Sequence, residues 1–288
     1  MSHPLISAPA LRARLASGAP LLLCDCSFDL ANPAAGAAAH AQRHLPGALY
    51  LGLDTDLSAP PTPHTPANAG RGRHPLPTPQ AFVQRLADLG FDDGLAVVAY
   101  DNAGGMFAAR LWWLLRWVGH AAVQVLDGGL AAWQAAGGAL QAGPVPPRPP
   151  GRFTRRPALV PVVDFNAVRA GLGRHPRLIV DARAPDRFRG ENETLDPVGG
   201  HIPGAVNRFF RDNLGADGRF KPADALRAEW LAVLAGRQPA DLVAQCGSGV
   251  TACHHLLALD VAGLAGAALY PGSWSEWCAQ PDAPVAVG

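Results

Sequence analysis

The chain has 288 residues, of which 49% are hydrophobic and 16% are charged, and its formal net charge is +1. A chain so close to neutral has no electrostatic reason to bind nucleic acid or an acidic membrane surface. Its length is typical of two domains. We find no apolar run of the roughly 18 residues that a membrane helix needs, and no basic region followed by an apolar one at the N-terminus, so we expect a cytoplasmic protein.

The first half alternates short apolar runs with segments of helical length. Leu21–Cys26 and Leu95–Tyr100 are strand-like, and Met106–Val118 has the spacing of a helix. The later segment Val125–Trp133 begins as another apolar run and contains the pair Gly128-Gly129. Short apolar runs that alternate with helices are typical of a parallel sheet covered by helices.

The second half repeats four landmarks of the first half in the same order. Residues 21–26 return at 178–182, His44-Leu45-Pro46-Gly47-Ala48 returns as His201-Ile202-Pro203-Gly204-Ala205, 95–100 returns at 241–245, and 125–133 returns at 269–277. A helix-length segment, Thr251–Ala262, again follows the third landmark. Repetition of this kind predicts two halves with one α/β fold.

A proline-rich stretch separates the two halves. Residues 143–156 contain five prolines, a composition that resists helix and favours an extended connector. We therefore expect a first domain at residues 1–142, a linker at 143–158 and a second domain at 159–288.

The most informative motif is the run from Val243 to Ala252, where Cys246 follows an apolar strand. Gly247 and Gly249 permit backbone angles that side-chained residues resist, and a helix-length segment begins at Thr251. At such a turn, converging N–H groups and the helix dipole favour a thiolate and would also stabilise a persulfide. A buried structural cysteine is the alternative. The repeat has Asp101 at the matching position of the first half, so only one half carries this thiol.

The remaining cysteines do not indicate a disulfide framework or a metal site. Five cysteines in a long chain are an odd number, and Cys24 and Cys26 alternate within an apolar run. His254 and His255 are adjacent on an expected helix, so they point in different directions and do not easily chelate one ion. We expect neither a metal nor an organic cofactor.

Over nearly its whole length, the chain resembles the two-domain rhodanese-type sulfurtransferases. The paired His-[Leu/Ile]-Pro-Gly-Ala segments resemble the N-terminal signature of that family, and residues 267–277 resemble its C-terminal signature. The resemblance implies two tandem rhodanese-like domains, with a non-catalytic first domain and a catalytic second domain. It also implies a ping-pong reaction, in which Cys246 takes sulfur from a donor as a persulfide and passes it to cyanide, a thiol or thioredoxin.

Within the family, Cys-Gly-Ser-Gly-Val-Thr resembles the loop of the 3-mercaptopyruvate sulfurtransferase branch. By that resemblance, Ser248, His74 and Asp54 match a triad that handles protons, and the loop residues Gly247, Gly249, Val250 and Thr251 bind substrate. Mercaptopyruvate leaves as an enolate that must gain a proton, whereas thiosulfate leaves as sulfite without one. Taken alone, His74 reads as a surface histidine in a proline-rich loop and Asp54 as a turn residue.

Arginines after the strand at 178–180 are the candidates for binding the donor anion. By resemblance, Arg187 binds the anionic group of the substrate and Arg183 belongs to the active site; a buried ion pair with Asp181 or Asp186 is the alternative for Arg183. The branch has a second arginine where this chain has Asp196. A carboxylate there would repel a substrate carboxylate unless it is turned away or paired, which keeps thiosulfate open as the donor.

Two other classes of protein remain to be considered. Dual-specificity phosphatases have a similar cysteine loop, but their loop ends in an arginine, and Ala252 is the sixth residue after Cys246 here. A non-enzymatic rhodanese-like binding module does not require Cys246. We therefore expect a sulfurtransferase that uses 3-mercaptopyruvate, with thiosulfate as the alternative donor.

Overall fold

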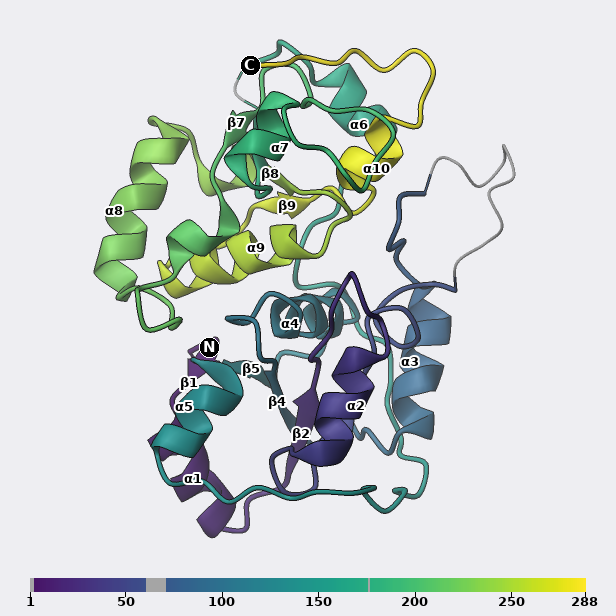
Figure 1. Cartoon of the computed structure of the whole chain (residues 1–288), viewed down its shortest axis with the longest axis vertical. Helices are drawn as coiled ribbons and strands as arrows, with labels where there is room; N and C mark the ends of the chain where they lie inside the picture. Colours follow the sequence, from purple (N-terminus) through teal and green to yellow (C-terminus); the bar gives the residue numbers. More distant parts are fainter. Residues whose placement is uncertain (1–2, 61–70, 176) are drawn as a thin grey trace. The chain divides into compact units, whose positions relative to one another are not determined.

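The computed structural model describes residues 3–60, 71–175 and 177–288 (Figure 1). By packing, the chain forms two compact units. The described part of the first unit comprises residues 3–60, 77–159 and 216–220, and that of the second comprises 71–76, 160–175, 177–215 and 221–288. Two short segments, 71–76 and 216–220, therefore pack with the unit that is built mainly from the other half of the chain.

The first unit is built on a five-stranded parallel sheet. Its strand order is β1-β5-β4-β2-β3. The strands are β1 (Leu5–Ile6), β2 (Leu21–Asp25), β3 (Leu49–Tyr50), β4 (Ala96–Tyr100) and β5 (Val123–Leu126). The central strands β2 and β4 are apolar along most of their length because both faces of a parallel sheet are covered.

Five helices belong to this unit in the described part of the chain. They are α1 (Ala8–Ala16), α2 (Ala35–Gln42), α3 (Pro79–Asp88), α4 (Ala108–Trp117) and α5 (Gly129–Ala135). Ser7 and Thr78 cap α1 and α3 by accepting backbone N–H groups three residues on. Leu11 of α1 and Trp133 of α5 pack against Leu23 and Val98 of the sheet. The buried α4, predicted at Met106–Val118, packs against β4 and β5.

The second unit repeats this sheet with four strands. They are β6 (Leu178–Asp181), β7 (Val206–Asn207), β8 (Leu242–Gln245) and β9 (Ala268–Leu269), in the parallel order β7-β6-β8-β9. An isolated parallel bridge from Val162 to Leu269 occupies the place that β1 has beside β5. In sequence order, β2 to β5 of the first unit thus correspond to β6 to β9 of the second.

Helices again follow the strands. They are α6 (Phe165–Ala170), α7 (Pro185–Arg189), α8 (Ala223–Leu234), α9 (Thr251–Val261) and α10 (Ser273–Trp277), with short 3₁₀ turns at Phe210–Asn213 (η1) and Pro239–Asp241 (η2). Val168 of α6 and Trp274 and Trp277 of α10 pack against Ile179 and Val243 of the sheet. The helix predicted at Thr251–Ala262 is α9, which packs against β8 and β9.

The fold predicted from the internal repeat is confirmed: the two units are α/β domains, each with a parallel sheet flanked by helices. Even the histidines of the repeated His-X-Pro-Gly-Ala segments make equivalent contacts. His44 forms an antiparallel bridge with Gln141, and His201 forms one with Ala286. Each pairs its histidine segment with an extended stretch at the end of the same half.

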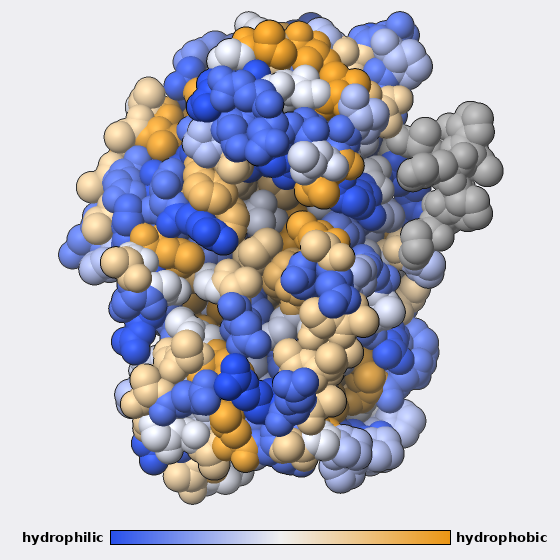
Figure 2. All heavy atoms as spheres, viewed as in Figure 1, coloured by the Kyte–Doolittle hydropathy of each residue, from blue (hydrophilic) through white to orange (hydrophobic). Residues whose placement is uncertain are grey.

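Hydrophilic residues are interspersed with hydrophobic ones over the visible surface (Figure 2). Within residues 3–60, 71–175 and 177–288, we find no helix that is both long and apolar enough to span a membrane.

Candidate active site

Cys246 lies directly after the last residue of β8, and its turn leads into α9. The residue is only 2% exposed. β8 is buried along its whole length, so the strand holds Cys246 in a fixed position at its carboxyl end. The carboxyl end of a central parallel strand is the edge at which α/β sheets bind ligands. The sequence motif therefore produces the predicted strand, cysteine turn and helix.

Gly249 gives the turn its shape and contacts the sulfur. Its φ is +76°, and a Cβ atom at this position would lie 2.3 Å from the carbonyl oxygen of Pro271. The left-handed backbone and the lack of space both require glycine. The Gly249 N–H donates to Sγ of Cys246 over 3.1 Å.

A second segment, at the start of α10, holds the other side of the turn. Ser273 Oγ accepts the backbone N–H of Cys246 (3.1 Å) and donates to the carbonyl of Tyr270 (2.9 Å). The N–H groups of Trp274 and Ser275 donate to the carbonyls of Cys246 and Gly247, both over 2.9 Å. The sequence interpretation missed Ser273. Its signal was the repeat, since Gly129 stands at the matching position of the first half.

Ser273 is fully buried and has a φ of +55°, in the left-handed region that favours glycine. Gly129 has nearly the same angle, +54°, and a Cβ atom on it would lie 2.1 Å from the carbonyl oxygen of Asp101. A non-glycine residue in this region costs about 1–3 kcal/mol. Because the Ser273 hydroxyl accepts the Cys246 N–H, the second unit retains a strained residue that supports the cysteine.

Ser248 and His74 meet within the second unit. The Ser248 hydroxyl is 2.7 Å from Nδ1 of His74, and both residues are buried. The segment 71–76 reaches this position because Arg73 N–H donates to Ser275 Oγ (3.0 Å) and Gly72 lies against the backbone of Gly272. The structure thus brings together two of the three residues that match the proton-handling triad.

Asp54, the third residue of that predicted triad, lies in the first unit, in the turns after β3. It is partly buried, and burial raises the pKa of its carboxyl group. Its participation stays a prediction. Val250 and Thr251 lie where the sequence predicted: Val250 is buried at the end of the turn, and Thr251 is the first residue of α9.

The two candidate arginines have different surroundings. Arg183 is buried, its Nε and Nη2 donate to the Asp181 carboxylate, and Nη2 also donates to the carbonyl of Gly200 over 2.7 Å. This is one of the two alternatives that the sequence left open. Arg187 is more exposed, and its Nε and Nη2 donate to both carboxylate oxygens of Glu193 over 2.7–3.0 Å. Arg183 also reaches Glu193 (3.4 Å), so it helps to hold the partner of Arg187.

Asp196, which stands where the branch has an arginine, is buried and paired. Its carboxylate is 2.6 Å from Nη1 of Arg73 and 3.5 Å from Nη2 of Arg187. Burial raises the pKa of Asp196, and the nearby Glu193 adds to that effect, while the two arginines oppose it. Burial also acts to raise the pKa of Glu193, but hydrogen bonds from Arg187 and Leu195 outweigh it and lower that pKa.

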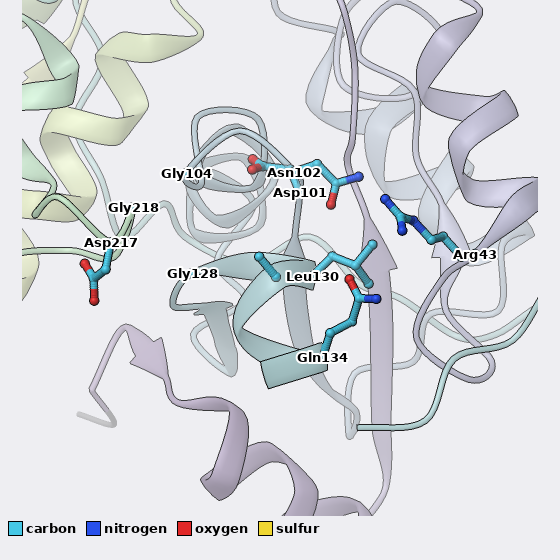
Figure 3. A pocket seen from close by; sticks show the side chains of 10 residues that line it. Arg43, Asp101, Asn102, Gly104, Gly128, Leu130, Gln134, Asp217 and Gly218 are labelled. Atoms are coloured by element: carbon cyan, nitrogen blue, oxygen red, sulfur yellow. The ribbon is translucent and has the colours of Figure 1, made fainter. Parts of the chain in front are cut away.

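The matching turn of the first unit contains no thiol but is tightly closed. The Asp101 carboxylate accepts the N–H groups of Ala103, Gly105, Phe107 and Ala108 over 2.8–2.9 Å. Asp101 also lines a pocket of about 350 Å³, together with Arg43, Asn102 and Gln134 (Figure 3). The N–H groups of this turn are therefore already taken by a fixed anion.

Other histidines and acids in the described residues form no metal site. No group of three or more histidine, cysteine or acidic side chains in residues 3–60, 71–175 and 177–288 could hold an ion. His254 and His255 both contact the side chain of Asn213. The cysteine site thus contains one thiol, one hydroxyl–imidazole pair and guanidinium groups, which suits the binding of a small anion beside a nucleophilic sulfur.

Comparison with known proteins agrees with this geometry. The Rhodanese-like domain family matches residues 7–136 and 164–280. A probable 3-mercaptopyruvate sulfurtransferase from Pseudomonas aeruginosa is 48% identical over 288 residues, which is 100% of this chain and 99% of that protein. A putative thiosulfate sulfurtransferase from Mycobacterium tuberculosis is 39% identical over 99% of this chain and 97% of its own length.

The same family is found among solved structures. The 3-mercaptopyruvate sulfurtransferase from Leishmania major aligns with a TM-score of 0.82 and 29% identity, over 95% of this chain and 73% of that one. The match of both halves, the full-length similarity and the cysteine turn lead to one conclusion: the chain belongs to the rhodanese family and is a two-domain sulfurtransferase with a sulfur donor and a sulfur acceptor as substrates.

Proposed function

We propose that the protein transfers sulfane sulfur from 3-mercaptopyruvate to cyanide or a thiol through a persulfide on Cys246. The observation that carries the proposal is the 2.7 Å contact between the Ser248 hydroxyl and Nδ1 of His74. Ser248 is the second residue after Cys246 in the turn. A proton-handling pair at this position is useful for a donor whose leaving group must be protonated. The similarity to the relative from Pseudomonas aeruginosa supports the same donor.

In the first half-reaction, the Cys246 thiolate attacks the thiol sulfur of mercaptopyruvate. The carbon–sulfur bond breaks, and its electron pair passes to the carbon skeleton as the enolate of pyruvate. Ser248 supplies a proton to the enolate, His74 replaces the proton on Ser248, and the proton lost from the donor thiol restores His74, which Asp54 is proposed to orient. Pyruvate leaves, and Cys246 holds the transferred sulfur as a persulfide.

The turn stabilises the charge on the persulfide. The Gly249 N–H already donates to Sγ at 3.1 Å, and the backbone N–H groups of Gly247, Val250 and Thr251 are proposed to bind the charged outer sulfur. In the second half-reaction, cyanide, a small thiol or thioredoxin attacks the outer sulfur. The sulfur–sulfur bond breaks, and its electron pair returns to Cys246 as the thiolate.

Arg187 is proposed to bind the anionic group of the donor, since its guanidinium lies beside the turn and is partly exposed. Arg183 acts on the donor indirectly, through Glu193 and Arg187. Its buried pair with Asp181 and its contact with Glu193 fix the carboxylate that orients Arg187. We therefore assign Arg183 to positioning within this proposal.

Thiosulfate is the second candidate donor. The relative from Mycobacterium tuberculosis carries that name, and guanidinium groups also suit sulfonate oxygens. Thiosulfate releases sulfite, which needs no proton, so the Ser248–His74 pair would contribute little to this reaction.

The test is steady-state sulfur transfer with 3-mercaptopyruvate and with thiosulfate, under identical acceptor conditions. A higher kcat/KM for mercaptopyruvate is expected, a preference for thiosulfate would favour the second candidate, and activity with neither would refute both. Peptide mapping by mass after donor treatment should find one added sulfur atom on Cys246. Cys24 and Cys26 serve as internal controls, because both are fully buried and burial raises their pKa values. Cys246→Ser should abolish both turnover and the added mass.

A further inference from the structure

Two guanidinium groups from distant segments converge beside the residue that follows Cys246. A Cβ atom built on Gly247 would lie 3.2 Å from Nη2 of Arg73 and 3.6 Å from Nη1 of Arg187. Arg73 comes from the segment 71–76, and Arg187 lies on α7. Because a Cβ atom 3.2 Å from Nη2 would be a tight contact, the lack of a side chain on Gly247 lets the guanidinium of Arg73 lie close to the turn.

Of the nitrogens near Gly247, Nη2 of Arg73 and Nη1 of Arg187 are not the ones that the acids hold, whereas Nη2 of Arg187, 3.7 Å from the same point, donates to Glu193. Arg187 uses Nε and Nη2 on Glu193, and Arg73 uses Nη1 on Asp196 and on the carbonyl of Leu195. In addition, Nε of Arg73 is buried and has no hydrogen-bond partner in the described part of the chain. A buried N–H without an acceptor is costly, so the guanidinium of Arg73 has unused capacity for an anion.

Asp196 explains why Arg73 is held there. Its carboxylate is only 4% exposed and lies 2.6 Å from Nη1 of Arg73. The acid that the sequence presented as an obstacle to anion binding is therefore neutralised, and it anchors a cation that arrives from another segment. Glu193 does the same for Arg187.

We propose that Arg73 is the second arginine of a two-arginine clamp that binds the anionic group of the sulfur donor. This inference rests on the proposed function and defines its substrate class: small donors with a carboxylate or a sulfonate group. Arg187 Nη1 and Arg73 Nη2 each donate to one oxygen of that group, and the anion holds the sulfur to be transferred next to Cys246. A neutral sulfur donor gains nothing from this clamp.

The main test is the kinetics of Arg73→Gln with 3-mercaptopyruvate and with thiosulfate. We expect KM to rise at least tenfold for the donor that the wild type uses, with kcat within about threefold, because the lost contact binds the donor before chemistry. Arg73→Lys should lie between, since it keeps the charge but loses the planar fork. A KM within twofold of wild type would overturn the proposal. A fall in kcat alone would also overturn it, because that result would indicate displacement of the neighbouring His74.

Two further variants separate direct binding from neutralisation of Asp196. Arg71→Gln removes a nearby positive charge that donates to the carbonyl of Leu76, and its KM should stay within twofold of wild type. Arg73→Gln combined with Asp196→Asn removes both partners of the pair. If Arg73 binds the donor, the double variant keeps a raised KM. A return to the wild-type KM would show that Arg73 only neutralises Asp196 and would refute the clamp.

A binding assay tests the clamp without turnover, so that its failure can be told from failure of the proposed function. Pyruvate carries the carboxylate of mercaptopyruvate without the transferable sulfur. It should slow the alkylation of Cys246 by iodoacetamide in the wild type, and at least tenfold more pyruvate should be needed in Arg73→Gln. Equal protection in the two proteins would overturn the clamp, even if sulfur transfer itself is measured.

Discussion

Replacement of Gly249 by alanine tests how the turn around Cys246 is held. Gly249 has a φ of +76°, and a Cβ atom there would lie 2.3 Å from the carbonyl oxygen of Pro271. The matched control is Gly204→Ala, in the same unit. Gly204 has a φ of +79°, but nothing lies within 4 Å of a Cβ atom at that position. Both variants therefore lose stability because alanine is strained in the left-handed region, and only Gly249→Ala adds a steric clash.

The expected magnitudes follow from this difference. Alanine in the left-handed region costs about 1–2 kcal/mol at either position. At Gly249 the Pro271 carbonyl must also move by roughly an ångström, and forced overpacking typically costs about 1–3 kcal/mol more. With an m-value of about 2 kcal/mol/M, the urea midpoint of Gly249→Ala should lie about 0.5–1.5 M below that of Gly204→Ala.

Activity provides the second measurement. A shift of Gly249 displaces both the N–H that contacts Sγ at 3.1 Å and the adjacent Ser248, so kcat/KM should fall at least about tenfold with either donor. Gly204→Ala should stay within about twofold of wild type. Equal midpoints for the two variants, together with unchanged activity of Gly249→Ala, would refute the steric account of this turn.

Three further predictions concern proton transfer, backbone strain and pH. Ser248→Ala should lower kcat with mercaptopyruvate about a hundredfold and kcat with thiosulfate less than tenfold; equal losses in parallel assays would contradict a role in proton transfer. Ser273→Gly should be more stable to urea than Ser273→Ala by about 1 kcal/mol, because both lose the hydroxyl but only glycine relaxes the φ of +55°; equal midpoints would argue against strain. Burial raises the pKa of Glu276 from its ordinary value of 4.5 to about 6, so the folded state binds the proton more tightly than the unfolded state does. The free energy of unfolding should therefore fall by about 2 kcal/mol as pH rises from about 4.5 to about 6. Glu276→Gln should remove that fall in urea unfolding at several pH values, and the same dependence on pH in the variant would refute the assignment.

The sequence predicted those parts of the site that local chemistry determines. The apolar run 242–245, the glycine at 249 and the helix from Thr251 are read directly from residue types, because each depends on its near neighbours. The repeat predicted the sheet, since four landmarks in one order leave few possible strand orders. The helix expected at 106–118 begins and ends within two residues of that range in the structure.

The parts that the sequence did not predict depend on contacts between distant residues. Arg73 and Asp196 are separated by 123 positions, and nothing in either segment indicates that they form a pair. Likewise, only the fold decides that Arg183 is buried against Asp181 while Arg187 reaches the turn. The left-handed backbone of Ser273 could not be predicted for another reason. Residue type predicts glycine in that conformation, but this position keeps a serine because its hydroxyl contacts the N–H of Cys246.

The two halves also show why the same turn can serve structure in one unit and chemistry in the other. Converging N–H groups favour an anion, and in the first unit the Asp101 carboxylate accepts four of them. In the second unit, Cys246 stands at that position, and the Gly249 N–H contacts its sulfur. A thiolate or persulfide carries the charge that the carboxylate carries in the first half, so forming either species satisfies the turn. On this argument, the requirement of the fold for an anion at the end of the strand is the same physical effect that favours the sulfur species needed for transfer.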